Sequence, residues 1–287
     1  MDPKLTIVIP IYNEKQNISE TVDHIQEALS EAGFEWEIIC VNDGSDDGSE
    51  EVLSTIESIR VVNHKENKGY GAALKTGIRN ASFPYVCITD ADGTYPNHQI
   101  PGMFNEIVNN NLDMIVGSRT GKDVSYPVIK RIPKRMIISL ANYISNTKIP
   151  DINSGLRIFR KDRATDFIHL YPNGFSFTTT ITMAMICSEL NVDFFPIDYY
   201  KRKGKSKIHP WKDTVGFFNL LLKIALYFNP FKFFRPIIWL FFLISIYFLV
   251  RDVFYLKDLT QGSVFFPIVT LILFTLGLMS DLIIKRR

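Results

Sequence analysis

The stretch LTIVIPI at Leu5–Ile11 is a continuous apolar run, of the kind that forms a strand buried on both faces of a parallel sheet. A helical pattern follows it to about Glu31. Apolar runs and helical patterns keep alternating through the first hundred residues and slightly beyond, with further strands predicted at Glu37–Val41, Ile59–Asn63, Tyr85–Thr89 and Asp113–Gly117. This order predicts an α/β fold with parallel strands. Beyond Thr120 the pattern weakens and predicts no connection order.

Polar clusters follow the predicted strands at their carboxyl ends. They are Tyr12-Asn13-Glu14, Asn42-Asp43-Gly44-Ser45, Asp90-Ala91-Asp92 and Gly117-Ser118-Arg119. In an open α/β sheet the ligand binds in the crevice outside this edge. The sequence therefore predicts a ligand site built from these clusters.

The acidic turn Asp90-Ala91-Asp92 has two interpretations. Carboxylates two residues apart on an extended segment project to one side of it. Mg²⁺ is typically held by one or two carboxylates together with substrate phosphates and water. A simple polar turn is the alternative, because Asp92-Gly93 is a common turn pair. From these residues alone both interpretations stay open.

The composition of the chain limits its function classes. A net charge of +2 over 287 residues is too small to indicate a nucleic-acid partner. Cys40, Cys87 and Cys187 lie far apart, so we expect reduced thiols and neither a disulfide framework nor a zinc site. The first residues lead directly into the first strand, and we expect no signal peptide.

The C-terminal part of the chain differs sharply in composition from the rest. Pro236–Val250 and Gly262–Ser280 carry no charged residue, and each approaches the roughly 20 apolar residues that a spanning helix needs. The alternative is a buried helical hairpin of a soluble domain. Because a polar connector, Arg251–Gln261, separates the two stretches, we favour two transmembrane helices at about 233–251 and 262–282.

The distribution of basic residues predicts the orientation of these helices. Lys232 and Arg235 precede the uncharged stretch Pro236–Val250, and Lys285-Arg286-Arg287 follows the stretch Gly262–Ser280, whereas the basic residues of the connector are offset by acidic ones. The positive-inside rule then places both chain ends and the soluble domain in the cytoplasm. Ahead of the spans, Trp211–Pro230 mixes lysines with apolar residues and favours an interfacial helix, with ordinary core packing as the rival. We therefore predict a catalytic domain at 1–207, an interfacial region at 208–231 and a transmembrane hairpin at 232–287.

Seven motifs, taken in order, resemble a known family. VIPIYNE (Val8–Glu14), VNDGSDDGS (Val41–Ser49), NKGYGAALKTG (Asn67–Gly77), DADGTYP (Asp90–Pro96) and GSR (Gly117–Arg119) are similar to those of family 2 glycosyltransferases of GT-A fold. DINSGLRIFRK (Asp151–Lys161) and RKGKSK (Arg202–Lys207) resemble its polyprenyl-phosphate branch, typified by dolichol-phosphate mannose synthase. The resemblance covers residues 4 to about 230. It implies a Rossmann-like nucleotide-sugar-binding sheet and inverting transfer from a nucleoside-diphosphate sugar.

The resemblance also implies where the donor binds. The positions that match nucleotide-binding residues of the family are Pro10, Tyr12, Glu14, Asp43, Lys68, Asp90 and Ala91. Asp90 and Asp92 match the positions that hold Mg²⁺ or Mn²⁺ and the diphosphate. Asn42 departs from the family, because an acid usually stands there. Thr94 departs too, where some members carry a glutamine metal ligand, so a hydroxyl or a water must complete the metal shell.

The acceptor is expected to carry a phosphate. An inverting enzyme that acts on a hydroxyl needs a base, yet Tyr171–Ser188, where we expect the acceptor, contains no Asp or Glu. A phosphate monoester has a second pKa of about 6, so it is mostly dianionic at neutral pH and needs no base. By the same resemblance its contacts are Arg119, Arg135 and Arg202, and Ser139 lies one helical turn from Arg135. Alternatively, Lys130–Arg135 anchors the protein to anionic headgroups.

The leading hypothesis is a metal-dependent glycosyltransferase that joins a sugar to polyprenyl phosphate, dolichyl or undecaprenyl, at the cytoplasmic membrane face. Its expected partners are a UDP- or GDP-linked sugar, the lipid phosphate and the membrane, with a homo-oligomer left open. The expected catalytic residues are Asp90, Asp92, Arg119 and Arg202. One alternative is transfer to a hydroxyl of a lipid-linked sugar or glycolipid, and another is a catalytically inactive membrane scaffold. We expect the sugar specificity to reside in the loops at Tyr95–Pro101 and Phe175–Thr180.

Overall fold

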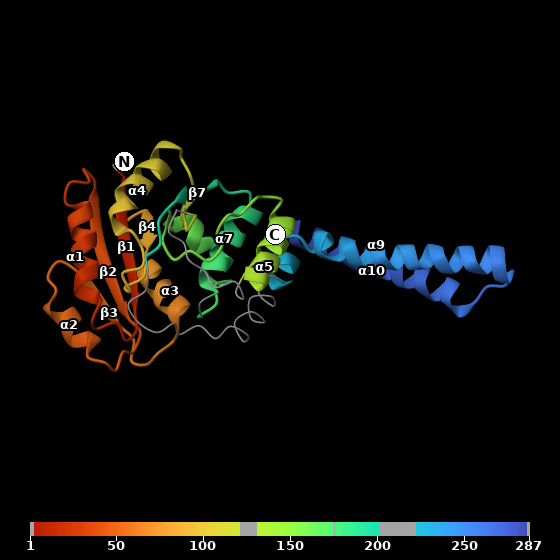
Figure 1. Ribbon diagram of the computed structural model, residues 1–287, viewed down its shortest axis with the longest axis horizontal. Helices are drawn as coiled ribbons and strands as arrows, with labels where there is room; N and C mark the ends of the chain where they lie inside the picture. Colours follow the sequence, from red (N-terminus) through yellow and green to blue (C-terminus); the bar gives the residue numbers. More distant parts are fainter. Residues whose placement is uncertain (1–2, 121–130, 175, 201–221, 286–287) are drawn as a thin grey trace. The chain divides into compact units, whose positions relative to one another are not determined.

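The computed structural model describes residues 3–120, 131–174, 176–200 and 222–285 (Figure 1). The chain divides into two compact units, Met1–Phe217 and Phe218–Arg287. The predicted domain boundaries at 207 and 231 stay predictions. Most of the predicted interfacial helix lies outside the described residues, although residues 222–228 are helical.

The first unit is built on one mixed sheet. In the described part of the chain its strand order is β3-β2-β1-β4-β6-β5-β7. The strands are β1 (Lys4–Ile11), β2 (Glu35–Asn42), β3 (Arg60–Asn63), β4 (Tyr85–Ile88), β5 (Met114–Ser118), β6 (Arg157–Arg160) and β7 (Val192–Pro196). The five strands predicted from the sequence are all confirmed. These five strands run in the same direction, as predicted, whereas β6, a strand that was not predicted, runs antiparallel to both of its neighbours, β4 and β5.

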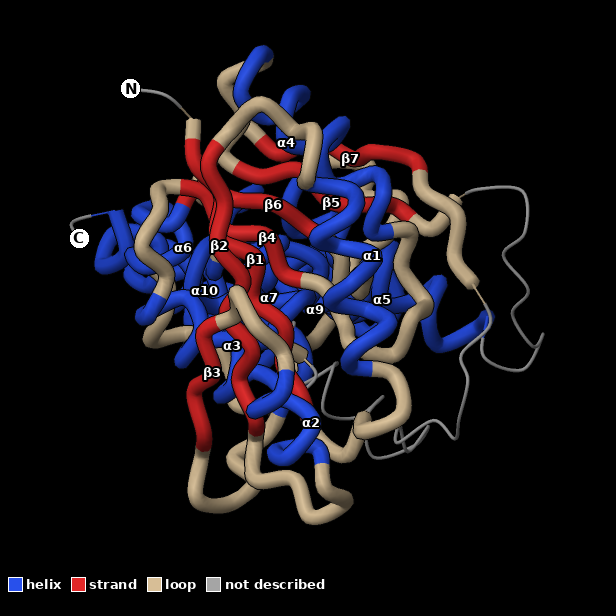
Figure 2. The backbone as a smooth tube through the Cα atoms, turned by 90° about the vertical axis from the view of Figure 1, so that its left-hand side faces the viewer, coloured by secondary structure: helices blue, strands red, loops and turns tan. Residues whose placement is uncertain are grey.

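Helices cover both faces of this sheet (Figure 2). Alternate residues of β1, from Leu5 to Ile11, join one apolar cluster with α1 (Ile18–Leu29) and α4 (Ile100–Asn109). The opposite face of β1 contacts α3 (Tyr70–Asn80). This two-sided burial is why the strand sequence is continuously apolar. The remaining described helices of the unit are α2 (Ser49–Thr55), η1 (Asn97–Gln99), α5 (Arg131–Ser145), α6 (Lys161–Asp166) and α7 (Phe177–Cys187).

Gly77 allows α3 to lie directly on β1. A Cβ at Gly77 would stand 2.2 Å from Cγ1 of Val8. We therefore expect Gly77→Ala to lower the free energy of unfolding by about 1–3 kcal/mol, because the overpacking outweighs the gain of about 1 kcal/mol in helix propensity. Gly102 in α4 is the matched control, since a Cβ there meets nothing within 4 Å. Thermal unfolding of both variants in detergent should show Gly77→Ala melting lower than wild type and Gly102→Ala melting no lower. Equal melting temperatures for the two would contradict this packing.

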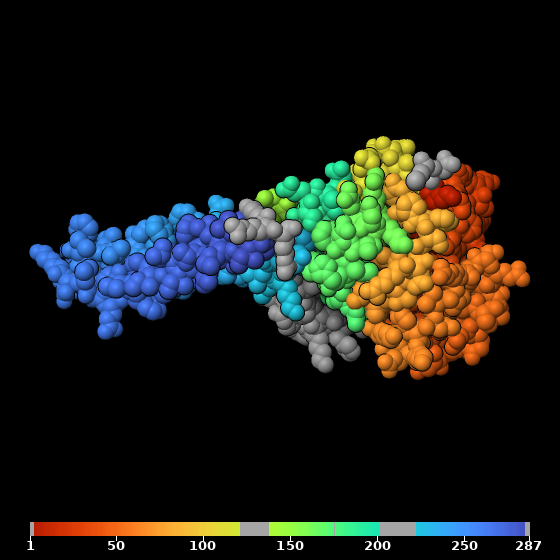
Figure 3. Space-filling view, turned by 180° about the vertical axis from the view of Figure 1, so that it is seen from behind, coloured from red at the N-terminus to blue at the C-terminus, as the bar shows by residue number. Residues whose placement is uncertain are grey.

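The second unit contains a pair of long apolar helices. They are α9 (Pro230–Arg251), continued by η3 (Asp252–Leu256), and α10 (Gln261–Lys285). The candidate spans Pro230–Leu256 and Gln261–Ile284 each have a mean hydropathy of 2.1, and only 6% and 11% of an 18-residue apolar stretch in each is buried. A buried hairpin of a soluble domain would be mostly enclosed, whereas many leucine, phenylalanine and tyrosine side chains of these helices are exposed. The two helices are the blue part of the chain in Figure 3. Both helices are long and apolar enough to cross a membrane.

The two helices pack on each other, and hydrogen bonds hold the connector between them. The rings of Phe248 and Phe266 stack with centroids 5.0 Å apart. At the turn, the buried carboxylate of Asp252 accepts hydrogen bonds from the Arg251 guanidinium at 2.7 Å and from the backbone N–H of Thr260 at 2.7 Å. The charges of the connector are therefore partly neutralised within the hairpin itself.

Candidate active site at the carboxyl edge of the sheet

The acidic turn after β4 is rigidly held. Asp92 is 7% exposed, and its Oδ1 accepts hydrogen bonds from the backbone N–H of Thr94 at 3.2 Å and from its hydroxyl at 2.6 Å. The Ala91 carbonyl accepts a hydrogen bond from the Thr21 hydroxyl of α1 at 3.0 Å. Asp90 Oδ1 accepts one from the Tyr70 hydroxyl at 2.9 Å. Asp90 and Ala91 are thus held by α3 and α1, and Asp92 is held within the turn itself.

Gly155 leaves room beside Asp90. A Cβ at this position would stand 2.9 Å from Asp90 Oδ2. Among the described residues, no group of three or more His, Cys, Asp or Glu side chains is placed to hold a metal ion by itself. Two carboxylates with phosphate and water oxygens are nevertheless a usual set for Mg²⁺. Asp90 and Asp92 therefore fit a divalent cation that arrives with a diphosphate. In this arrangement the Thr94 hydroxyl orients Asp92.

The loop after β1 is interlocked with the loop after β2. Asn13, with φ of 54°, exchanges hydrogen bonds with Asp46: its Nδ2 donates to Asp46 Oδ1 at 2.7 Å, and its Oδ1 accepts from the Asp46 backbone N–H at 3.0 Å. The backbone N–H of Glu14 donates to the Ser49 hydroxyl at 3.2 Å. These contacts bring Tyr12 and Glu14 to the same edge of the sheet as Asp43. The strand-end clustering expected from the sequence is therefore present on this side.

Asp43 is buried and holds the loop before α3. Its Oδ1 lies 2.6 Å from His64 Nδ1 and accepts the backbone N–H of Lys68 at 3.0 Å, while Oδ2 accepts the backbone N–H of Gly69 at 2.8 Å. Lys68, a predicted nucleotide contact, is an exposed residue that contacts Asp43 through its backbone N–H. His64 was not predicted. The signal for it was available, because it directly follows β3 at the same sheet edge.

Asn42 has a structural use at the position where the family usually has an acid. Its Nδ2 donates to Asn63 Oδ1 at 3.1 Å, and its Oδ1 accepts the backbone N–H of Ser45 at 3.1 Å. The amide therefore links the ends of β2 and β3 and shapes the following turn. A carboxylate could not make the first of these bonds as a donor.

Arg119 forms a two-pronged ion pair with Asp151. Its Nε lies 2.7 Å from Asp151 Oδ2 and its Nη2 lies 2.9 Å from Oδ1, and the guanidinium stands 5.1 Å from the centre of the Tyr199 ring. The side chains are 11% and 2% exposed. This fork orients the arginine at the end of β5. Asp151 opens one of the motifs quoted above, but its role as the partner of Arg119 was not predicted.

The site contains a second cation, Arg157, which was not predicted from the sequence. It lies fully buried at the start of β6, and its Nη1 donates to the Thr178 carbonyl at 2.9 Å and to the Thr182 hydroxyl at 2.8 Å, both on α7. Its Nη2 donates to the Ser154 carbonyl. Burial lowers the pKa of Arg157 to about 10, which still leaves it charged at neutral pH. A buried positive charge therefore joins α7 to the segment that passes Asp90.

The remaining predicted acceptor contacts are only partly described. Ser139 is an exposed residue of α5, and Arg135 lies on the same helix, with its side chain outside the described residues. Arg202 and the RKGKSK motif also lie outside them. The role of these residues stays a prediction.

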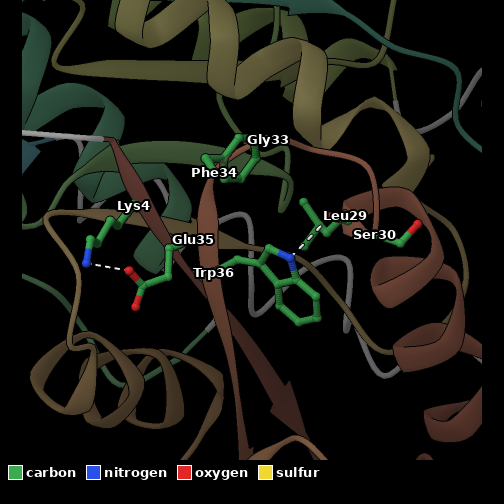
Figure 4. A pocket seen from close by; sticks show the side chains of 7 residues that line it. All are labelled: Lys4, Leu29, Ser30, Gly33, Phe34, Glu35 and Trp36. Atoms are coloured by element: carbon green, nitrogen blue, oxygen red, sulfur yellow. Dashed lines mark hydrogen bonds and ion pairs between the residues drawn. The ribbon is translucent and has the colours of Figure 1, made fainter.

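The surface carries two hollows near this sheet. One lies away from the carboxyl edge, and the other borders it. The hollow in Figure 4, about 430 Å³, is lined by Lys4, Leu29, Ser30, Gly33, Phe34, Glu35 and Trp36. Lys4 and Glu35 are paired at the amino ends of β1 and β2, so this hollow lies at the opposite edge of the sheet. A second hollow of about 460 Å³ is lined by His64, Glu66, Asn67, Lys68, Ala72, Lys75, Thr76, Arg79 and Asn173. It borders the loop that Asp43 holds.

The fold is that of GT-A glycosyltransferases. Crystal structures of glucosyl-3-phosphoglycerate synthase from Mycobacterium tuberculosis match it, for example the complex with Mn²⁺, UDP and glucosyl-3-phosphoglycerate. That match has a TM-score of 0.60 and 16% identity, and it covers 78% of this chain and 80% of the other. At this identity the likeness concerns the fold alone.

The sequence places the chain more narrowly. Residues 6–166 match the family described as Glycosyl transferase family 2, and the chain belongs to this family. A dolichyl-phosphate hexose transferase of Haloferax volcanii is 28% identical over 226 residues, which are 77% of this chain and 94% of the relative. A dolichol-phosphate mannosyltransferase of Pyrococcus furiosus is 31% identical, with 60% of this chain and 50% of the relative covered. A dodecaprenyl-phosphate galacturonate synthase of Rhizobium johnstonii is 30% identical, with 55% and 48% covered. The chain thus matches about half the length of the last two.

Proposed function

We propose that this chain is an inverting glycosyltransferase that moves a sugar from a nucleoside-diphosphate sugar to a polyprenyl phosphate. The observation that carries the proposal is the composition of the site. Two held carboxylates, Asp90 and Asp92, follow β4. The cation Arg119 is held by Asp151 at the end of β5, and the cation Arg157 donates to α7, a helix without any Asp or Glu. The names of the relatives support the same acceptor class.

The chemistry follows from this composition. An oxygen of the lipid phosphate forms a bond to the anomeric carbon, and the bond from that carbon to the β-phosphate oxygen of the donor breaks. The phosphate is already dianionic at neutral pH, so no carboxylate is needed to remove a proton. A divalent cation bound at Asp90 and Asp92 would supply neutralising charge for the departing diphosphate. Arg119, held by Asp151, would orient the anionic acceptor.

The location of the reaction is part of the proposal. The apolar pair α9 and α10 would anchor the chain in a membrane, and the excess of lysine and arginine at both outer ends of the pair supports a cytoplasmic catalytic unit. There the enzyme would meet both a soluble nucleotide sugar and a lipid phosphate.

A paired acceptor assay tests this function. Full-length protein in detergent is given radiolabelled UDP- or GDP-sugars with Mg²⁺ or Mn²⁺, and either a short polyprenyl phosphate or the matching polyprenol. We expect label in the organic extract with the phosphate and none above background with the alcohol. Label on a hydroxyl acceptor but not on the phosphate would contradict the proposal. Absence of any metal-dependent nucleotide binding would instead indicate a scaffold.

A further inference from the structure

Three consecutive residues connect the two halves of the candidate donor site. Asp43, on the nucleoside side, accepts the backbone N–H groups of Lys68 and Gly69. The next residue, Tyr70, donates its hydroxyl to Asp90 on the metal side at 2.9 Å. The segment 68–70 therefore spans from one half of the site to the other without an intervening residue.

This segment is held in place by its backbone. Gly69 has φ of 99°, and a Cβ there would stand 2.5 Å from the Asn173 carbonyl oxygen. A Cβ at Gly71 would stand 2.2 Å from the Pro172 carbonyl oxygen, and the Ala72 N–H donates to the Asn173 carbonyl at 3.1 Å. The start of α3 is thus pressed against residues 172–173. Because this close packing leaves the backbone little freedom, it also fixes the position of Tyr70 at the end of the segment.

The tyrosine is suited to hold a carboxylate. A tyrosine hydroxyl keeps its proton at neutral pH, and here it donates to Asp90 Oδ1 at 2.9 Å. The hydrogen bond holds Oδ1 of Asp90, and Gly155, which has no Cβ, leaves space beside the other oxygen, Oδ2. One oxygen of the carboxylate is therefore held in place before any ligand binds.

We infer that Tyr70 is a positioning residue of the donor site, which orients Asp90 for a divalent cation, and that the Asp43–His64 pair sustains this orientation through the segment 68–70. The inference rests on the proposed function and deepens it. His64 belongs to the arrangement because its ring bridges Asp43, at 2.6 Å, and the Thr76 hydroxyl of α3, at 2.9 Å. The nucleoside end and the metal end of the donor site are thereby coupled.

Tyr70→Phe isolates this role, because it removes only the hydroxyl. Calorimetry of UDP and GDP binding to the full-length protein is carried out over a titration of Mg²⁺ and of Mn²⁺. We expect Tyr70→Phe to raise the metal concentration for half-maximal nucleotide binding by about tenfold, the typical weight of a hydrogen bond to a charged group. At saturating metal, nucleotide affinity should stay within about twofold of wild type. Tyr85→Phe on β4, a half-buried tyrosine, is the matched control and should leave the metal requirement unchanged.

The coupling is tested by adding His64→Ala. Alone it should raise the metal requirement in the same direction, and in the Tyr70→Phe background it should add little, because both act on the same carboxylate. A metal requirement that Tyr70→Phe does not change, even with a lower melting temperature, would overturn the positioning role. Fully additive effects of the two substitutions would overturn the coupling. Wild-type protein that binds neither nucleotide at any metal concentration would overturn the proposed function together with this inference.

Discussion

Asp92→Ala is expected to lower the rate of sugar transfer by about a thousandfold or more, the scale on which loss of a preorganised electrostatic group acts. Asp92 is one of only two carboxylates in the acidic turn, and its Oδ1 is oriented by both the N–H and the hydroxyl of Thr94. Alanine removes one of the two carboxylates at the place where we propose that the diphosphate leaves. The initial rate of label incorporation into extractable lipid, at saturating donor and metal, measures the effect.

Asp23→Ala is the matched control for Asp92→Ala. Asp23 is an exposed acid of α1, so its removal should leave both transfer and melting temperature close to wild type. Asp92→Ala should keep its fold, because the turn retains the Thr21–Ala91 hydrogen bond. If the Asp92→Ala enzyme transferred sugar at the wild-type rate, Asp92 would have no role in the site.

Arg119→Ala is expected to affect both stability and acceptor use. It leaves the carboxylate of Asp151, 2% exposed, without its two-pronged partner, and breaking such a buried pair costs about 3–5 kcal/mol of unfolding free energy. Transfer should fall as well, and the KM for polyprenyl phosphate should rise if the protein still folds. Thermal unfolding in detergent and acceptor titrations measure the two effects separately.

The double variant Arg119→Ala/Asp151→Ala separates the two effects. Removing the carboxylate of Asp151, which has lost its arginine partner, should recover a large part of the lost stability, because no unpaired buried charge remains. It should not recover transfer, since the proposed phosphate contact is still missing. A double variant with wild-type transfer would show that Arg119 serves only the fold. An Arg119→Ala variant as stable as wild type would contradict the buried ion pair.

The sheet and the edge that carries the site were predictable because each depends on local patterns. Apolar runs gave the strands, and polar residues directly after them marked the carboxyl edge, where Asp43, Asp90 and Arg119 lie. The antiparallel strand β6 was not predicted, since its four residues, Arg157–Arg160, begin and end with arginine and lack the apolar run of a parallel strand. Its insertion between β4 and β5 depends on long-range pairing, which no local pattern encodes.

The partners of the site residues were the least predictable part. Tyr70 lies 20 residues from Asp90 in sequence, and Asp151 lies 32 from Arg119. Arg157 was unexpected for another reason. It is a fully buried charged residue whose Nη atoms donate to backbone carbonyls and a threonine hydroxyl and not to a carboxylate, and its Nε has no hydrogen-bond partner among the described residues. Asp43 was predicted as a nucleoside contact, and its hold on the loop before α3 emerged only from the folded chain.

The most direct test of the central claim is the acid lability of the labelled lipid. Product made by the full-length protein from labelled nucleotide sugar and polyprenyl phosphate is heated in mild acid and extracted again. A sugar joined to a lipid monophosphate should be released into the aqueous phase, because its anomeric phosphate bond is labile. A product whose label stays in the organic phase would be an ordinary glycoside, and it would contradict a phosphate acceptor.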